Sequence, residues 1–242
     1  MSSPVLVPHP DKEALASGIA ARLATAVLDA QARKELAEIS LTGGSMGGLT
    51  IAALLVEPAW AAVDPRRVQV WWGDERWLPR GHPERNDTQA DEAGIRRLGL
   101  DPDLVHRVPG PDESDSPEEA AAEYARVVQA RGTGDFDVVM LGVGPDGHVA
   151  SLFPGHPAQL TSDAVAVGVH DSPKPPPERV SLTIECLSRS EQVWFLVSGQ
   201  DKSAAVRDGL DGAPAERSTA TQVTGRRATL WLVDEAARPV SG

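Results

Sequence analysis

The spacing of apolar residues predicts a chain of alternating helices and strands. Between positions 15 and 37 apolar side chains fall at helical intervals, as in Leu15, Ile19 and Leu23. Short, mainly apolar segments such as Val68–Trp72 are typical of buried strands. The predicted strands are Ile39–Thr42, Val68–Trp72, Phe136–Leu141, Ala164–Val169, Arg179–Ile184, Val193–Val197 and Ala228–Val233. The predicted helices are Leu15–Ala37, Leu49–Leu55, Ala90–Leu98, Ser116–Ala130 and Asp201–Leu210.

This alternation favours one α/β domain spanning residues 1–242, because no repeat or linker interrupts it. Its sheet should be largely parallel, with helices on both faces. Ligands of such sheets bind at the carboxyl ends of the strands. The loops that begin there are 43–48, 73–76, 142–148 and 198–202, and they hold most of the unusual residues.

Proline-rich and acidic segments mark the irregular connections. Pro79–Asn86 and Asp171–Glu178 are predicted loops, and the second of these holds four prolines. Pro109–Pro117 is predicted to be an acidic surface loop. At its end Ser116 precedes Glu119 by three residues, the spacing of a capping box that opens a helix.

Composition and charge exclude several classes of function. The 242 residues carry a net charge of −12, which repels nucleic acid and anionic membranes. The single cysteine, Cys186, allows neither an intramolecular disulfide nor a thiolate zinc cluster, and it fits a reducing cytoplasm. No apolar run reaches the roughly 18 residues that a membrane span needs. The same negative charge repels an anionic substrate, so a phosphate site would need locally clustered donors.

A glycine-rich segment, Thr42–Gly48, joins a predicted strand to a predicted helix. Glycines let the backbone turn tightly, and a helix N-terminus presents unpaired N–H groups that bind phosphate. The segment also matches the Gly-x-Ser-x-Gly nucleophile elbow, but only about one strand precedes Ser45, too few for that hydrolase fold. It is not a Walker loop, because no Gly-Lys-Ser/Thr follows. A phosphate loop at Gly43, Gly44 and Ser45 is favoured over a tight turn without function.

A second glycine loop, Gly142–His148, carries a candidate general base. Its glycine spacing fits a dinucleotide-binding fingerprint, but Asp146 would point a carboxylate at the pyrophosphate, so we reject nicotinamide binding. A histidine such as His148 can take a proton from water near neutral pH, and Asp146 can orient its ring. The alternative is a turn aspartate followed by a surface histidine.

Charged residues lie at three further positions near strand ends. Asp74, Glu75 and Arg76 follow a strand that is predicted to be buried in the core, where charge is costly unless it is functional or well paired. Arg76 could hold a phosphate or polarise a carbonyl; the alternative is a structural cluster of ion pairs. Arg179 opens a strand, and Lys202 begins a helix, where a lysine opposes the helix dipole and favours a local anion. For these two cations the alternative is a solvated surface charge.

These motifs, in this order, resemble the 6-phosphogluconolactonases of the pentose phosphate pathway over nearly the whole chain. Leu141–Gly155 is similar to the most characteristic segment of that family. Asn86 resembles a family asparagine, although the family usually has Ser-Asn where this chain has Arg85-Asn86. The other matching segments are Thr42–Ser45, Asp74–Arg76, Arg179–Thr183 and Gly199–Lys202.

The resemblance implies a Rossmann-like three-layer αβα sandwich with a mostly parallel sheet, as in glucosamine-6-phosphate deaminase. That deaminase, a sugar-phosphate isomerase relative, is the nearest rival, since it also carries Asp-Gly-His after a glycine loop. It places a glutamate five residues after the histidine, where this chain has Phe153, which cannot relay a proton. A non-catalytic sugar-phosphate-sensing domain is the other alternative. Repressors of that kind carry an N-terminal helix-turn-helix, whereas here the domain is expected to begin almost at the first residue.

The resemblance further implies hydrolysis of 6-phospho-D-glucono-1,5-lactone to 6-phospho-D-gluconate. We expect a cytoplasmic monomer that needs no metal or cofactor and binds neither nucleic acid nor membrane. His148 would be the general base on water, with Asp146, Asp74 and Arg76 as further catalytic residues. The residues expected to bind substrate and phosphate are Gly43, Gly44, Ser45, Arg76, Asn86, Arg179 and Lys202.

Overall fold

The computed structural model describes residues 3–239, so the first two and last three positions of the predicted 1–242 domain lie outside it. The strands are β1 (Pro4–His9), β2 (Ala37–Leu41), β3 (Val68–Trp72), β4 (Asp74–Arg76), β5 (Val138–Gly142), β6 (Ala166–Val169), β7 (Arg179–Leu182), β8 (Gln192–Val197) and β9 (Ala228–Asp234). The α-helices are α1 (Lys12–Gln31), α2 (Gly44–Leu54), α3 (Asn86–Ala93), α4 (Pro117–Arg131), α5 (Ile184–Ser188) and α6 (Ser203–Asp211).

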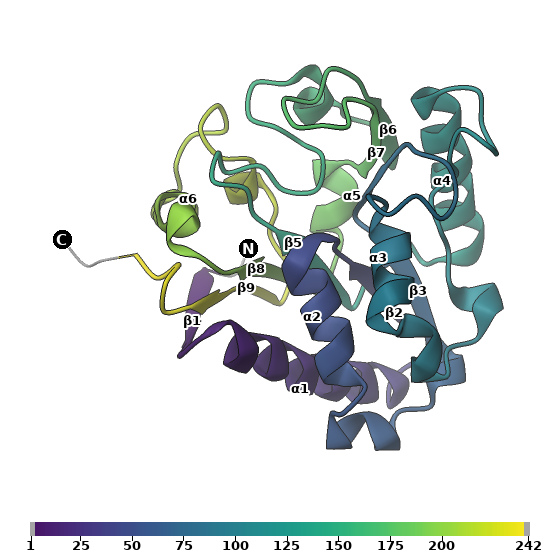
Figure 1. Ribbon diagram of the computed structural model, residues 1–242, viewed down its shortest axis with the longest axis vertical. Helices are drawn as coiled ribbons and strands as arrows, with labels where there is room; N and C mark the ends of the chain where they lie inside the picture. The colour runs from purple at the N-terminus through teal and green to yellow at the C-terminus, as the bar shows by residue number, and fades with distance from the viewer. Residues whose placement is uncertain (1–2, 240–242) are drawn as a thin grey trace.

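Six strands form one parallel sheet in the order β1-β9-β8-β5-β2-β3 (Figure 1). From β2 the chain moves outward to β3 in one direction, and from β5 it moves outward to β8 and β9 in the other. The neighbouring strands β2 and β5 therefore mark the switch point of the sheet, where ligands of such folds bind. The predicted mostly parallel sheet is confirmed.

The parallel sheet separates two apolar cores, one on each face. Along β5, Val139 and Leu141 join one core while Val138 and Met140 join the other, as the alternation of side chains in a strand requires. Helices α1, α2 and α3 contribute to the core that holds Met140, and α4, α5 and α6 to the core that holds Leu141. This is the three-layer αβα arrangement that was expected. Within residues 3–239, no helix is both long enough and apolar enough to cross a membrane.

A second sheet, absent from the sequence prediction, is antiparallel and consists of β4, β7 and β6. The predicted strands Ala164–Val169 and Arg179–Ile184 shorten to β6 and β7 and belong to this sheet rather than to the parallel one. Asp74–Arg76 becomes a strand because it pairs with β7, with Asp74 opposite Ser181. The pairing brings the Asp-Glu-Arg segment next to the strand that Arg179 opens.

Three helix boundaries in α1 and α3 differ from the prediction for local reasons. Helix α1 ends at Gln31 rather than Ala37, because Ala37 is already the first residue of β2. Helix α3 begins at Asn86, inside the segment predicted as a loop. It stops before Gly94, whose φ of 100° lies in the left-handed region and splits the predicted Ala90–Leu98 helix into α3 and a 3-10 turn.

Candidate active site

The predicted phosphate loop forms the first turn of α2. The helix begins at Gly44 rather than at the predicted Leu49. Its N-cap, Gly43, has no side chain to occupy the free N–H groups, and the first turn carries no acidic residue. The N–H of Gly44 donates to Oε1 of Gln89 at 3.2 Å. The N–H of Ser45 lies within the first turn, ahead of the helix's own hydrogen bonds, so this end of α2 can receive an anion.

Asn86 closes one side of this loop and joins it to β4. Asn86 is 3% exposed. A Cβ added to Gly43 would lie 1.7 Å from Asn86 Oδ1, so only glycine fits at position 43. Its Nδ2 donates to the backbone oxygen of Asp74 at 2.9 Å and lies 3.3 Å from Asp74 Oδ1. Among the residues that the structure describes, Asn86 Oδ1 has no hydrogen-bond partner.

The second glycine loop meets the first at the switch point. The N–H of Gly142 donates to Oγ1 of Thr42 at 3.1 Å, which ties the end of β5 to the end of β2. Two residues further on, Gly144 lies against the predicted catalytic pair. A Cβ at this position would lie 2.1 Å from His148 Nδ1, so the pair can occupy its place only because residue 144 is glycine.

Asp146 and His148 form the pair that the spacing suggested, with Asp146 Oδ1 and His148 Nδ1 2.6 Å apart. Partial burial raises the pKa of Asp146, but the hydrogen bond from His148 and the charges of His148 and Lys174 outweigh burial and hold it well below its ordinary value. An ionised carboxylate only accepts hydrogen bonds, so the ring proton lies on Nδ1 and Nε2 is the nitrogen left to accept a proton. Within residues 3–239, Nε2 has no protein partner.

Phe153 backs the imidazole. Its ring is buried, and its centroid lies 4.4 Å from that of His148 at an interplanar angle of 36°. The Phe153 ring also contacts Arg179, whose guanidinium carbon lies 5.7 Å from the ring centroid. The position at which the deaminase has a glutamate therefore touches the histidine in this chain and presents an apolar ring to it.

Asp74 lies at the start of β4, and its carboxylate is held by neutral donors. Ser151 Oγ donates to Asp74 Oδ2 at 2.7 Å, and Asn86 lies at Oδ1. Asp74 is 8% exposed and lines the same cleft as His148. The carboxylate is thus positioned to accept hydrogen bonds from a ligand in the cleft.

The neighbouring Glu75 points away from the cleft into a buried ion cluster. Its carboxylate accepts from the backbone N–H groups of Asn86 at 2.7 Å and Asp87 at 2.9 Å. Arg85, which is fully buried, binds Asp87 with Nε at 2.9 Å and lies 3.9 Å from Glu75. Burial and the charge of Asp87 raise the pKa of Glu75 to about 7, against the opposing effect of Arg85. Glu75 is therefore structural, because it fixes the start of α3 and with it Asn86, whereas Asp74 and Arg76 line the cleft.

Arg76 and Lys202 both line the cleft and supply positive charge to it. Arg76 Nη1 donates to the backbone oxygen of Glu84 at 2.6 Å, while its buried Nε has no hydrogen-bond partner among residues 3–239. Burial lowers the pKa of Lys202, and the charge of Lys174 lowers it further, against the effect of Asp201. A phosphate dianion in the cleft would favour the charged form of this lysine.

Arg179 is 4% exposed, and most of the hydrogen bonds of its guanidinium go to backbone oxygens. Nη2 donates to the oxygens of Lys174 at 2.9 Å and Pro175 at 3.1 Å, and Nε donates to that of Pro176 at 3.1 Å. Nη1 lies 3.4 Å from Ser151 Oγ. Arg179 lines the cleft as expected, and it also braces the proline-rich loop.

Two residues of the site were missed by sequence reasoning. Lys174 projects from the proline-rich loop, with Nζ 3.4 Å from Asp146 Oδ1 and 3.4 Å from His148 Nδ1. Ser151 is completely buried and lies between Asp74 and Arg179. A lysine set among four prolines is a local signal that could have drawn attention to position 174. Nothing in the local sequence distinguishes Ser151 from an ordinary serine.

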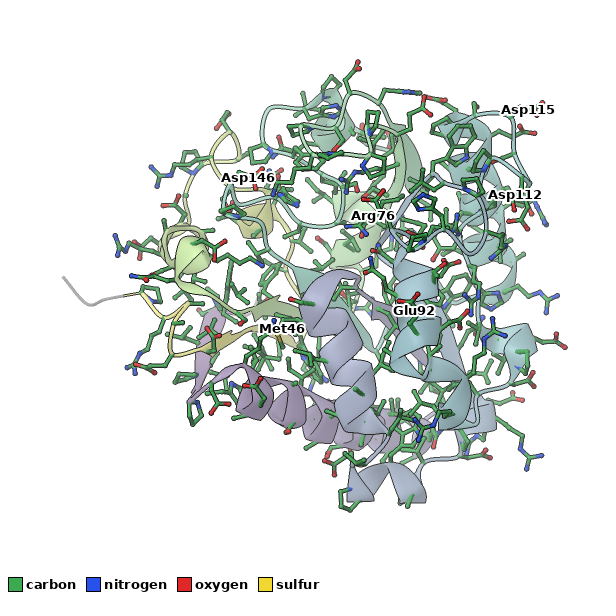
Figure 2. All side chains as sticks on the ribbon, viewed as in Figure 1. Met46, Arg76, Glu92, Asp112, Asp115 and Asp146 are labelled. Atoms are coloured by element: carbon green, nitrogen blue, oxygen red, sulfur yellow. The ribbon has the colours of Figure 1, made fainter. Side chains whose placement is uncertain are left out.

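Most of the predicted site residues, together with Lys174, line one cleft of about 310 Å³ at the carboxyl ends of the parallel strands. Figure 2 shows Arg76 and Asp146 on the same side of the molecule, above the start of α2, whereas Asp112 and Asp115 lie in the outlying acidic loop. Within the part of the chain that the structure describes, no three His, Cys, Asp or Glu side chains gather as a metal site would need. The predicted residues that line the cleft are Gly43, Gly44, Ser45, Asp74, Arg76, Asn86, His148, Arg179 and Lys202, while Asp146 contributes through His148.

The parallel sheet and the cleft at its switch point define a Rossmann-like α/β protein with a cationic ligand site. The family model described as glucosamine-6-phosphate isomerases/6-phosphogluconolactonase matches residues 10–231, and the chain belongs to this family. A Streptomyces coelicolor protein named 6-phosphogluconolactonase is 47% identical over 245 residues, covering 97% of this chain and 94% of that protein.

Solved structures share the fold. The crystal structure of 6-phosphogluconolactonase from Thermotoga maritima superposes with a TM-score of 0.84 at 24% identity, covering 96% of this chain and 100% of that one. A monomeric glucosamine-6-phosphate deaminase superposes with a TM-score of 0.80 at 20% identity, covering 96% of this chain and 98% of that one. Since both activities occur on this fold, the architecture alone does not decide between them, and the residues of the cleft must.

Proposed function

We propose that this chain is a carboxylic ester hydrolase that converts 6-phospho-D-glucono-1,5-lactone to 6-phospho-D-gluconate in the oxidative pentose phosphate pathway. The observation that carries the proposal is the Asp146–His148 pair, backed by Phe153, in a cleft lined by cations. Hydrolysis of a phosphorylated lactone needs a general base for water and a phosphate site, and this cleft offers candidates for both. The family membership and the similarity to the Streptomyces coelicolor protein support the same activity.

His148 Nε2 takes a proton from water while the water oxygen attacks the lactone carbonyl carbon. Asp146 remains ionised and stabilises the imidazolium that forms. The carbonyl oxygen gains negative charge in the tetrahedral intermediate, and Arg76 and the N–H groups of the glycine loops are the proposed donors to it. When the bond from this carbon to the ring oxygen breaks, His148 returns its proton to that oxygen. The product is an open-chain carboxylic acid, which then ionises.

The phosphate is proposed to bind at the first turn of α2, at Gly43–Ser45, together with Lys202 and Arg179. Asn86 and Asp74 would then face the hydroxyl groups of the sugar. A carboxylate and an amide oxygen are suitable acceptors for hydroxyl donors. Arg76 lines the cleft as well and is a further candidate for the phosphate.

We also propose that the protein works in the cytoplasm as a monomer without a metal or cofactor. A δ-lactone is already reactive toward water, so general-base assistance of roughly 10²–10⁴-fold is sufficient help. The single cysteine suits a reducing compartment. Sedimentation of the purified protein would test the oligomeric state.

The test is a coupled assay in which glucose-6-phosphate dehydrogenase generates the lactone and its disappearance is followed above spontaneous hydrolysis. We expect His148→Asn to lower kcat by at least about 10²-fold in a folded protein. His170→Asn is the matched control, because His170 is half exposed and pairs with Glu118 outside the cleft lining. Near-wild-type turnover of His148→Asn would refute the assignment.

The two alternative functions predict different outcomes when the same protein is assayed. A deaminase would release ammonia from glucosamine 6-phosphate, and Phe153 argues against it because a phenyl ring carries no proton to relay. A sensing domain would bind sugar phosphate without turnover, and a mobility-shift assay with DNA would test its regulatory role.

A further inference from the structure

Lys174 reaches the catalytic pair from outside the glycine loop. Its Nζ lies 3.4 Å from Asp146 Oδ1 and 3.4 Å from the Nδ1 of His148. The side chain is 41% exposed, so packing in the apolar core does not dictate where it points. The contact between Lys174 Nζ and His148 Nδ1 is longer than the 2.6 Å contact between Nδ1 and Asp146. The N–H at Nδ1 therefore donates to Asp146, and Lys174 acts on the ring through its charge.

The backbone of Lys174 is held by hydrogen bonds from Arg179 and Ser172. Its carbonyl oxygen accepts from Arg179 Nη2 at 2.9 Å and from Ser172 Oγ at 2.9 Å. Its N–H donates to Ser172 Oγ at 3.3 Å. Pro175 is fixed by a second bond from the same arginine. Because Arg179 is buried, these contacts anchor the loop to β7 and fix the point from which the lysine side chain extends.

We propose that Lys174 is a positioning residue for the reaction proposed above, one that holds Asp146 ionised beside His148 and keeps the imidazole in its neutral, proton-accepting form. A carboxylate at 2.6 Å favours the imidazolium, and a ring that is already protonated cannot take a proton from water. A positive charge 3.4 Å from the ring opposes that second positive charge. Asp146 and Lys174 therefore have opposite effects on the protonation of His148. Asp146 can orient the ring while the ring still accepts a proton from water.

Apart from Asp146, Lys174 is the charged residue that contacts the His148 ring in the part of the chain that the structure describes. Asp208, Glu216 and Arg217 border a neighbouring groove with Asp146, where Arg217 pairs with Asp208 at 3.1 Å. Asp146 comes from its own loop and Lys174 from the proline-rich loop. The segment that follows the glycine loop contributes only the apolar ring of Phe153, and Arg179 lies beyond that ring. Arg76 and Lys202 also line the cleft, but neither has a hydrogen-bond contact with the imidazole among the described residues. Lys174 is thus the cation best placed to control its charge.

The direct test is an NMR titration of the His148 ring in the wild type, Lys174→Gln and Lys174→Arg, with the His148 signal assigned from its loss in His148→Asn. At 3.4 Å in a water-like dielectric, loss of one positive charge should move the midpoint upward by about one pH unit at low ionic strength. Lys174→Arg keeps the charge and should restore the wild-type midpoint. Coincident midpoints in the wild type and Lys174→Gln would overturn the inference. The titration does not depend on activity, so it decides the inference even if the protein proves not to hydrolyse the lactone.

The pH profile of lactone hydrolysis gives a second, functional readout. In Lys174→Gln the acid limb of kcat/KM should move to higher pH by the same amount, and the rate at higher pH should approach that of the wild type. If kcat/KM of Lys174→Gln instead fell equally at every pH because KM rose, Lys174 would be a phosphate ligand, and the positioning role would be overturned. Absence of turnover in the wild type would refute the proposed function alone.

Discussion

Replacing Gly144 by alanine should displace the catalytic pair while leaving the fold intact. Gly144 is not among the glycines with positive φ, so its backbone conformation accepts a side chain. The new Cβ would lie 2.1 Å from His148 Nδ1 and 2.4 Å from Asp146 Oδ1, and real contacts of a Cβ do not fall below 3.0 Å. The imidazole must retreat by about 0.9 Å, and a displacement of about 1 Å at a reacting group costs roughly 10²-fold in rate. We therefore expect kcat to fall about 10²-fold, which corresponds to ~2.7 kcal/mol of activation free energy.

The assay is the initial rate of lactone disappearance, corrected for spontaneous hydrolysis, with thermal unfolding as the check that Gly144→Ala is folded. Gly48→Ala is the matched control, because a Cβ there would meet its nearest atom, in Ala93, at 3.9 Å. A folded Gly144→Ala protein with normal kcat would refute the reasoning. The double variant with His148→Asn should be no slower than His148→Asn alone. A full additional loss would show that the alanine acts elsewhere.

The remaining predictions concern the phosphate site and stability. Lys202→Ala should weaken binding of 6-phosphogluconate by roughly tenfold or more in calorimetry, because a charged hydrogen bond is lost, and unchanged affinity would place the phosphate elsewhere. Arg179→Ala should mainly raise KM if Arg179 binds phosphate, whereas steady-state kinetics showing a fall in kcat alone would mark it as only a brace of the proline-rich loop. The hydrogen bond to Glu118 raises the pKa of His170, so its stabilisation is complete below the unfolded value of about 6.5 and is lost as pH rises through the folded value. His170→Asn should therefore lower Tm by about 1–2 °C near pH 5.5 and leave it unchanged near pH 9, and equal losses at both would contradict this.

The parallel sheet could be predicted because its signals are local. Val68–Trp72 is apolar except at Gln69 and is observed as β3 at the predicted bounds. The N-terminus of α4 was readable from its cap, since Ser116 Oγ accepts from the N–H of Glu119 at 3.2 Å. Burial on both faces makes a parallel strand mainly apolar, and capping chemistry depends on neighbours in sequence. Both features can therefore be recognised without tertiary information.

The strands that the sequence did not indicate owe their structure to partners far along the chain. β1 (Pro4–His9) contains two prolines and several exposed positions, and it becomes a strand by pairing with β9 at the edge of the sheet. β4 consists of three charged residues and exists because it pairs with β7, more than 100 residues later. Strand propensity depends on such context, which explains why local patterns failed here.

In the candidate site, too, residues with a local sequence signal could be predicted and residues that depend on long-range contacts could not. His148 and Asp146 were found because two reactive side chains lie two residues apart in a glycine loop. Lys174 and Ser151 were missed because their roles arise from contacts across the fold, with Asp146 and Asp74 respectively. Lysine and serine are also common on surfaces, so their chemistry becomes evident only when a fold places them beside a reactive group.

A chain with a net charge of −12 can present a cationic cleft because its acidic side chains near the cleft are already engaged. Glu75 turns inward to backbone N–H groups, and Asp74 is held by a serine hydroxyl and an amide. The positive side chains that line the cleft include Arg76, Lys174 and Lys202. They come from separate segments of the chain that meet at the switch point of the sheet. Charges more than about 8–10 Å from a bound phosphate are largely screened at physiological salt, so these neighbours outweigh the surface acids once the ligand is bound. In the proposed function the net charge opposes the approach of an anionic substrate, while its affinity is set by the proposed phosphate donors, namely the first turn of α2, Arg179 and Lys202.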